Sequence, residues 1–273
     1  MTTADRELDI AAAIAETLEH LTCEETDGAL VARTPSWFGD VLFGGFVLAQ
    51  AIAAATRGAP EGRRLHSLHA YFLRPVAGGA TIAFRSTVLR QGRTFATHEL
   101  RAEQDGKLVL TMTSSFTGDT HGDEYDLGGL APDVPQPDDE TAEPGPGPWQ
   151  ACWVGPTPPA EDGTRTSTHR MWFRVPARLP DDHHLHTALL GFATDWTGVG
   201  GRPLRLDGDT EGMISLDHAV WFHRPARADE WLFYDVHSLV NAGGRGLLRG
   251  VMRDRVGRVV VSAAQEMLLR SDR

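Results

Sequence analysis

The sequence has few cysteines, almost no lysine and no long apolar run. Its two cysteines, Cys23 and Cys152, lie outside any Cys-x-x-Cys spacing, so neither a disulfide framework nor a thiolate metal or redox site is expected. Lys107 is the only lysine, so arginine carries nearly all of the 26 positive charges, which face 37 acidic residues for a net charge of −11. A chain this acidic repels nucleic acid and anionic membranes, and we expect neither as a partner.

Targeting and membrane-spanning signals are also missing. The first ten residues lack the basic and apolar regions of a signal peptide. The longest apolar run, about residues 41–55, is shorter than the ~20 residues that a membrane span needs. We therefore expect a cytoplasmic protein without a membrane span. Its 273 residues, 41% hydrophobic and 23% charged, suffice for one large globular domain or two ordinary ones.

Helical and strand-like patterns follow each other twice along the chain. An amphipathic helix is expected over residues 5–21, and residues 44–55 are apolar on every face, as in a buried helix. A second buried helix is predicted over residues 181–195. Period-two patterns predict strands at residues 29–33, 65–72, 81–89, 95–102 and 108–116, and again at 169–175, 214–222, 231–239, 246–253 and 258–268.

These two series indicate an internal duplication. Phe72-Leu73-Arg74-Pro75 aligns with Phe222-His223-Arg224-Pro225 at an offset of 150 residues, and the glycine turn at Gly106 aligns with Gly257 at an offset of 151. A long buried helix with an antiparallel meander is the hotdog arrangement. We therefore predict an α+β double hotdog whose two sheets pair edge to edge into one platform, which covers both exposed edges.

The division into units follows from composition. Residues 1–117 form the predicted N-terminal hotdog unit and residues 166–273 the C-terminal one. Between them, residues 118–165 are acidic and rich in proline and glycine, which predicts a linker that is partly disordered.

Several residues are candidates for a site on chemical grounds. Gln265 shares strand parity with apolar residues such as Val261 and Ala263, so its amide needs a buried partner. Its counterpart under the duplication is Ser114, which makes the two halves unequal. Gly44 and Gly45 begin a buried helix, where backbone N–H groups could bind an oxyanion.

Two other patterns give weaker indications of a functional site. Arg245 lies between two glycines and could reach a phosphate group, although an exposed turn arginine is the ordinary interpretation. Residues 181–186 (Asp-Asp-His-His-Leu-His) resemble metal ligands, but adjacent histidines on a helix point apart, and N-capping explains the acids. No Gly-x-Ser-x-Gly elbow supports a nucleophilic Ser-His-Asp triad.

Three long motifs together resemble the type II acyl-CoA thioesterases. The likeness runs from about Val41 to Arg270, without the acidic linker. The motifs are Gly44-Gly45-Phe46-Val47-Leu48-Ala49-Gln50-Ala51, Leu65-His66-Ser67-Leu68-His69-Ala70-Tyr71-Phe72-Leu73-Arg74-Pro75, and Leu216-Asp217-His218-Ala219-Val220-Trp221-Phe222-His223-Arg224-Pro225.

The resemblance implies a double-hotdog hydrolase that cleaves acyl-CoA to a free acid and CoA without a metal or organic cofactor. The family activates water with an Asp, a Thr and a Gln from its second half. They match Asp195 after Leu189-Leu190-Gly191-Phe192-Ala193-Thr194, Ser215 in place of the Thr, and Gln265 in a Gln-Glu pair. The serine keeps the hydroxyl but loses the methyl group that restrains the rotamer, which puts the rate in doubt more than the mechanism.

Two other functions stay open on the sequence alone. The chain could bind acyl-CoA with little or no catalysis, because fold does not fix function. It could also be a hotdog hydratase or dehydratase, for which His66, His69, His98 and His218 are available. From the resemblance we also expect a homodimer or homotetramer.

Overall fold

The computed structural model describes most of the chain. The described residues are 3–35, 41–118, 120–126, 128–145, 147–154, 169–196 and 213–269.

Three helices form where the sequence predicts them. They are α1 (Thr3–His20), α2 (Gly44–Arg57) and α3 (His183–Thr194). Asp182 caps α3 by accepting hydrogen bonds from the backbone N–H groups of His184 and Leu185. Most residues of α2 and α3 are buried, which confirms that both are core helices.

Antiparallel strands make up most of the remaining regular structure in the described parts of the chain. The first half contains β1 (Glu24–Thr26), β2 (Ala29–Arg33), β3 (Arg64–Phe72), β4 (Thr81–Gln91), β5 (Phe95–Gln104) and β6 (Lys107–Thr117). The second half contains β7 (Glu143–Pro144), β8 (Gln150–Trp153), β9 (His169–Arg174), β10 (Met213–Ser215), β11 (Asp217–Phe222), β12 (Leu232–Ala242), β13 (Arg245–Arg253) and β14 (Val259–Leu269). The sequence did not predict β1, β7 or β8.

All the strands belong to one continuous sheet. Its order is β1-β2-β4-β5-β6-β3-β11-β14-β13-β12-β9-β8-β7, with β10 beside β14. The halves meet where β3 pairs with β11, and this ladder is symmetric about the pair His69 and Ala219. Edge-to-edge pairing of the two predicted sheets is therefore confirmed.

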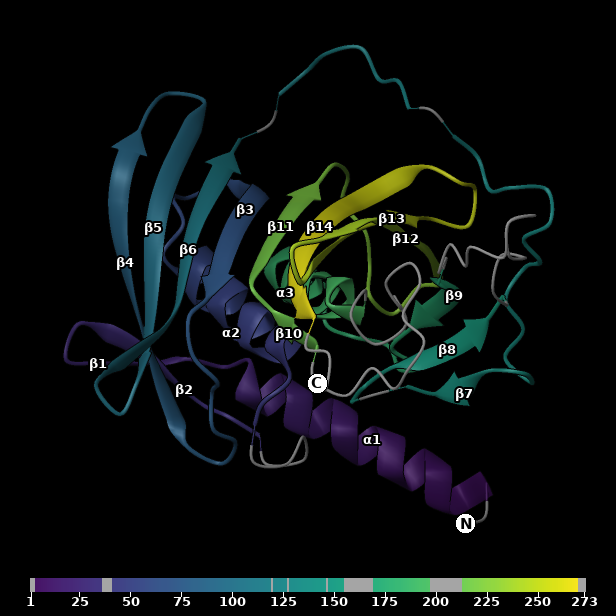
Figure 1. Cartoon of the computed structure of the whole chain (residues 1–273), viewed down its shortest axis with the longest axis horizontal. Coiled ribbons are helices and arrows are strands. Elements are labelled where there is room, and N and C mark those ends of the chain that lie inside the picture. Colours follow the sequence, from purple (N-terminus) through teal and green to yellow (C-terminus); the bar gives the residue numbers. More distant parts are fainter. Residues whose placement is uncertain are drawn as a thin grey trace.

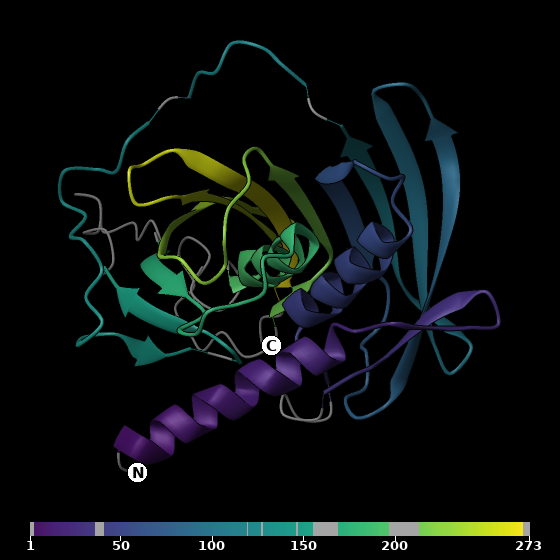
Figure 2. The same ribbon diagram turned by 180° about the vertical axis from the view of Figure 1, so that it is seen from behind.

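The strand registers repeat at the predicted offsets. Ala70 faces Met112 in the first half, and Val220 faces Ala263 in the second, at offsets of 150 and 151 residues. The sheet curves around α2 and α3, which lie side by side in its hollow (Figures 1 and 2). This is the expected α+β double hotdog.

The two core helices contact each other through large and very small side chains. The rings of Phe46 and Phe192 meet edge to face at 5.5 Å between centroids. A Cβ atom added to Gly45 would lie 2.6 Å from the carbonyl oxygen of Phe192. Gly45 therefore allows the N-terminus of α2 to approach the C-terminus of α3.

The described part of the segment between the halves packs against the second half. After β6 it arches over the molecule and then descends along the second half (Figure 1). Its Leu130 and Val134 pack against a buried cluster made of Cys152, Trp172, Trp231 and Phe233. The indole of Trp172 donates a hydrogen bond to the carbonyl of Pro135. These described residues pack against the second half, and the partial disorder of residues 118–165 stays a prediction. The strands β7 and β8 also lie within residues 118–165.

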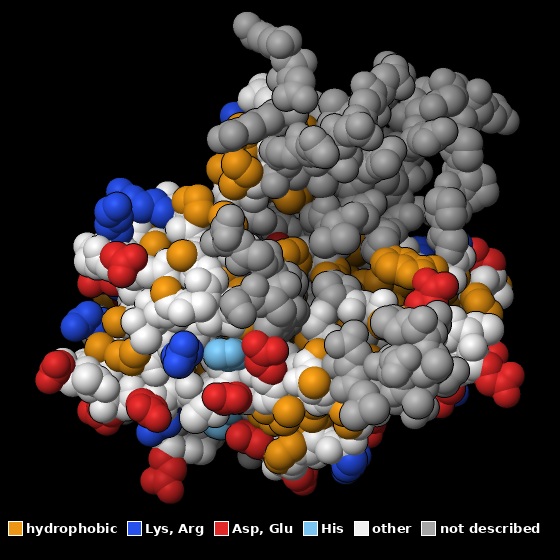
Figure 3. Space-filling model, turned by 90° about the horizontal axis from the view of Figure 1, so that it is seen from below, with side chains coloured by type: hydrophobic (Ala, Val, Ile, Leu, Met, Phe, Trp, Pro, Cys, Tyr) orange, Lys and Arg blue, Asp and Glu red, His pale blue; other side chains and the backbone are white. Residues whose placement is uncertain are grey.

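Among the described residues on the side seen in Figure 3, acidic and basic side chains are interspersed. Among the described residues, no helix combines the length and apolar character that crossing a membrane requires.

The helix contact generates a stability prediction. A Cβ atom at Gly191 would lie 2.2 Å from Cδ1 of Ile52 on α2. We expect Gly191→Ala to lower the free energy of unfolding by about 1–3 kcal/mol through overpacking, despite the better helix propensity of alanine. Urea unfolding measures this change. Ile52→Val removes Cδ1, so adding it to Gly191→Ala should recover most of the lost free energy of unfolding. Equal destabilisation by Gly191→Ala in the native and the Ile52→Val backgrounds would contradict the explanation.

Candidate active site

Asp195 lies between the ends of the two core helices. It is the C-cap residue of α3 and is only 2% exposed. The backbone N–H of Gly45, in the first turn of α2, donates a hydrogen bond to its carboxylate. A Cβ atom at Gly44 would lie 3.0 Å from Oδ2 of Asp195. The two glycines therefore bring a helix N-terminus, which favours negative charge, directly onto this carboxylate.

Gln265 and Ser215 complete a compact polar group with Asp195. Nε2 of Gln265 donates to Oδ1 of Asp195 at 2.5 Å and to Oγ of Ser215 at 2.7 Å. The Ser215 hydroxyl also hydrogen bonds to Asp195. Gln265 is fully buried on β14, and Ser215 ends β10, which pairs with β14. The structure thus brings together three residues that are far apart in the sequence.

The environment shifts the pKa of Asp195 strongly. Burial disfavours the charged carboxylate and raises its pKa from the ordinary 3.8 to about 7. Hydrogen bonds from Gln265, the Gly45 N–H and Ser215 oppose this effect. The result is a carboxylate that can both accept and release a proton near neutral pH.

Three residues beside Asp195 were not predicted to support it. Nε2 of His218 lies 2.8 Å from the Thr194 hydroxyl, and that hydroxyl donates to the Gly191 carbonyl. His218 must therefore donate from Nε2, which leaves Nδ1 as an acceptor 3.8 Å from Asp195 Oδ1. The Tyr234 hydroxyl donates to the Thr194 carbonyl. Tyr234 carried no sequence signal, because it stands among apolar residues of a strand.

The equivalent place in the first half has different chemistry. Thr56 hydrogen bonds to the carbonyl three residues earlier, as Thr194 does, but the next residue is Arg57 rather than aspartate. By the register offsets, Ser114 stands for Gln265 and Leu68 for His218. The acid and the amide therefore occur together at one end of the helix pair only.

The other predicted residues lie in different surroundings. Arg245 is exposed at the start of β13, where its Nε forms an ion pair with Glu266 at 2.9 Å. At the start of α3, Asp181 pairs with Arg227 while Asp182 caps the helix. Within the described residues, no group of three or more His, Cys, Asp or Glu side chains is placed to hold a metal ion.

Both halves of the chain match known protein families. Residues 33–117 match the acyl-CoA thioesterase N-terminal domain, and residues 129–269 match the acyl-CoA thioesterase C-terminal domain. The chain belongs to the acyl-CoA thioesterase family. This confirms the resemblance that the sequence motifs indicated.

Individual members of the family are similar over most of their length. Acyl-CoA thioesterase 2 of Haemophilus influenzae is 30% identical over 252 residues, which cover 84% of this chain and 87% of that protein. Human acyl-coenzyme A thioesterase 8 is 27% identical over 257 residues, covering 84% and 80%. The crystal structure of an acyl-CoA thioesterase II from Mycobacterium marinum superposes with a TM-score of 0.80 at 30% identity, covering 94% and 98%.

The hydrogen bond from Gln265 makes the pKa of Asp195 testable without an activity assay. Gln265→Ala removes the main donor that favours the carboxylate, so the pKa should rise above about 7. Carbon-13 NMR of the Asp195 carboxyl group, identified by its loss in Asp195→Asn, measures the titration. Ser114→Ala, at the equivalent place in the first half, is the control and should leave this pKa unchanged. An unchanged or lower pKa in Gln265→Ala would refute the assigned role.

Proposed function

We propose that this protein hydrolyses acyl-CoA thioesters by direct attack of a water molecule activated by Asp195, Gln265 and Ser215. The observation that carries the proposal is the buried Asp195 carboxylate, whose pKa is about 7 and which is bonded to Gln265. Hydrolysis of acyl-CoA is also the activity named for the family to which the chain belongs.

The three groups suit the chemistry of this step. Asp195 takes a proton from the water as the water oxygen forms a bond to the thioester carbonyl carbon. Gln265 and Ser215 lie within hydrogen-bonding distance of each other and of Asp195, and the proposal places the attacking water against this group. The tetrahedral intermediate then collapses, the C–S bond breaks, and CoA leaves as a thiolate that takes up the proton.

The proposed substrate contacts are Gly44, Gly45 and Arg245. The N-terminus of α2 lies against Asp195, and the proposal assigns the Gly44 N–H, together with the Gly45 N–H once it releases Asp195, to the negative charge that develops on the thioester carbonyl oxygen. Arg245 is exposed and would exchange Glu266 for a phosphate group of CoA. None of these residues requires a metal or an organic cofactor.

The pairing of Asp195 with Gln265 favours hydrolysis over a hydratase, because an acid and an amide are the groups with which the thioesterases that the sequence resembles activate water. His218 lies 3.8 Å from Asp195, and burial lowers its pKa to about 4, so its imidazole is neutral near pH 7.

Thiol release from short, medium and long acyl-CoAs tests the proposal. We expect the native protein to release CoA, and Asp195→Asn to be at least roughly a hundredfold slower because the general base is lost. Gln265→Ala should also be slow, whereas Ser114→Ala should match the native rate. Absence of hydrolysis together with thermal protection by acyl-CoA would indicate a binding protein and reject the catalytic assignment.

The pKa of Asp195 predicts the pH dependence. The base must be ionised, and its pKa is raised, so activity is lost as the pH falls through about 7. We expect kcat/KM to decrease tenfold per unit below that value and to level off above it. A profile that stays flat to pH 5 would exclude Asp195 as the base.

Three further features remain proposals. We propose a cytoplasmic protein that forms a homodimer or homotetramer, and the exposed Tyr71, Leu73, Phe95 and Trp221 side chains support association. We also propose that residues 1–117 and 166–273 are the folding units, with residues 118–165 as the connection whose strands join the second unit.

A further inference from the structure

The two halves repeat a pair of cations beside their Arg-Pro loops. Arg74 and Lys107 in the first half correspond to Arg224 and Arg258 in the second, at the offsets of 150 and 151 residues. The local geometry is the same, because Arg74 Nη1 donates to the Leu108 carbonyl at 2.6 Å and Arg224 Nη1 donates to the Val259 carbonyl at 2.7 Å. The sole lysine of the chain thus preserves a positive charge at this place.

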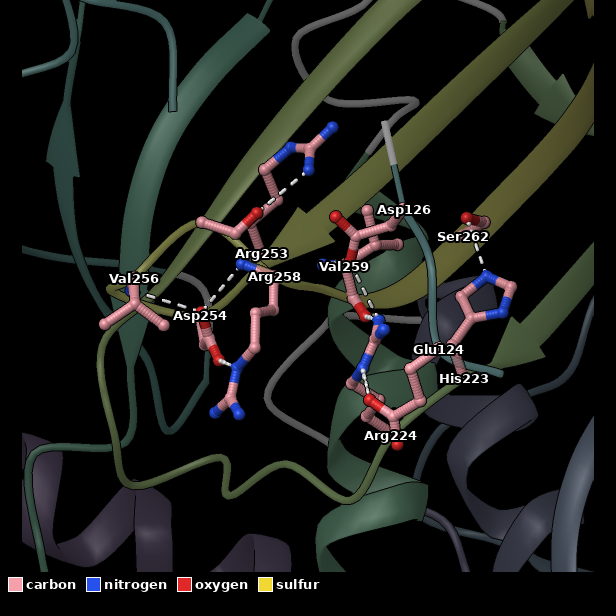
Figure 4. A network of polar contacts seen from close by, with 11 residues as sticks. Glu124, Asp126, His223, Arg224, Arg253, Asp254, Val256, Arg258, Val259 and Ser262 are labelled. Carbon is pink, nitrogen blue, oxygen red and sulfur yellow. Dashed lines mark hydrogen bonds and ion pairs between the residues drawn. The ribbon is translucent and has the colours of Figure 1, made fainter. Parts of the chain in front are cut away.

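In the second half, carboxylates of the connecting segment occupy this place. Asp126 Oδ2 accepts from Arg224 Nη1 at 3.0 Å and from the backbone N–H of Val259 at 3.2 Å. Glu124 adds an ion pair to Arg224 at 3.6 Å (Figure 4). The arginine and the neighbouring strand therefore form an anion-binding arrangement, and the chain itself supplies the anion.

In the first half, the same place is an open pocket. A cavity of about 280 Å³ is lined by residues that include Arg74, Lys107, Val41 and Asp105. Both cations are exposed, and among the described residues neither has a carboxylate within ion-pair distance. Two positive charges thus face one acid at this pocket, on a protein whose net charge is −11.

The pocket lies next to the segment that leads into the candidate active site. Val41 pairs with Ala77, and the N–H of Leu42 donates to the Val76 carbonyl. Four residues after Val41, Gly45 donates to Asp195. Fully extended, this segment spans at most ~14 Å, a distance that the flexible pantetheine arm between the thioester and the phosphates of CoA can bridge.

We propose that Arg74 and Lys107 bind phosphate groups of acyl-CoA in this pocket, beside the segment that leads to Gly45, whereas the sibling pair Arg224 and Arg258 in the second half is neutralised by the chain's own acids. This inference rests on the proposed function. A local cation pair is needed because the overall field of the protein repels a polyanionic substrate. Arg74 and Lys107 are positioned for this task without first giving up an ion pair.

Kinetics with two substrates that share an acyl group test the inference. Acyl-CoA carries the phosphates, whereas the corresponding acyl-pantetheine lacks them. We expect Arg74→Gln and Lys107→Gln each to raise KM for acyl-CoA about five- to tenfold with little change in kcat. Neither variant should change KM for acyl-pantetheine. Arg258→Gln removes one charge from the sibling pair and is the control, with native KM for both substrates.

The outcomes separate the possible failures. Two outcomes would overturn the inference: equal changes in KM for both substrates, or an unchanged KM for acyl-CoA in Lys107→Gln. The Lys107 side chain makes no hydrogen bond within the described structure, so its replacement should not impair folding. If the native protein hydrolyses neither substrate, the proposed function fails instead. Thermal protection by CoA would then still test the pocket, since it should be weaker in Lys107→Gln than in Arg258→Gln.

Discussion

The backbone pairing of β3 with β11 is the constraint from which the other features of the molecule follow. It joins two meanders into one sheet and relates them by an approximate two-fold axis through His69 and Ala219. Next to this ladder, the N-terminus of α2 meets the C-terminus of α3. The close approach of α2 and α3 at Gly45 depends on this arrangement.

Two equivalent helix ends exist, but only one has the acid. At one end Asp195 meets Gln265, Ser215 and the N-terminus of α2. At the other end, Arg57 and Ser114 occupy the corresponding positions, and the connecting segment neutralises the nearby Arg224. The second half therefore contributes the carboxylate, the amide and the hydroxyl, while the first half contributes the helix N-terminus that meets them.

The sequence predicted the long strands, the core helices and the repeat because these depend on periodicity within short segments. The resemblance pointed to Asp195, Ser215 and Gln265, and the structure brings these three residues together. The anchoring of residues 120–154 was missed because it depends on contacts with distant side chains such as Trp172 and Arg224. The support of Asp195 by Thr194 and Tyr234 was missed for the same reason.

The presence of the acid at one helix end only also limits how much the site destabilises the folded protein. Because the pKa of Asp195 is raised from 3.8 to about 7, ionisation of this carboxylate lowers the free energy of unfolding by about 4 kcal/mol. A symmetric dimer of single units would carry two such carboxylates and bear that penalty twice. Because Arg57 replaces the second acid, fusion of the units confines the penalty to one position. The single chain therefore carries this destabilisation at one position instead of two.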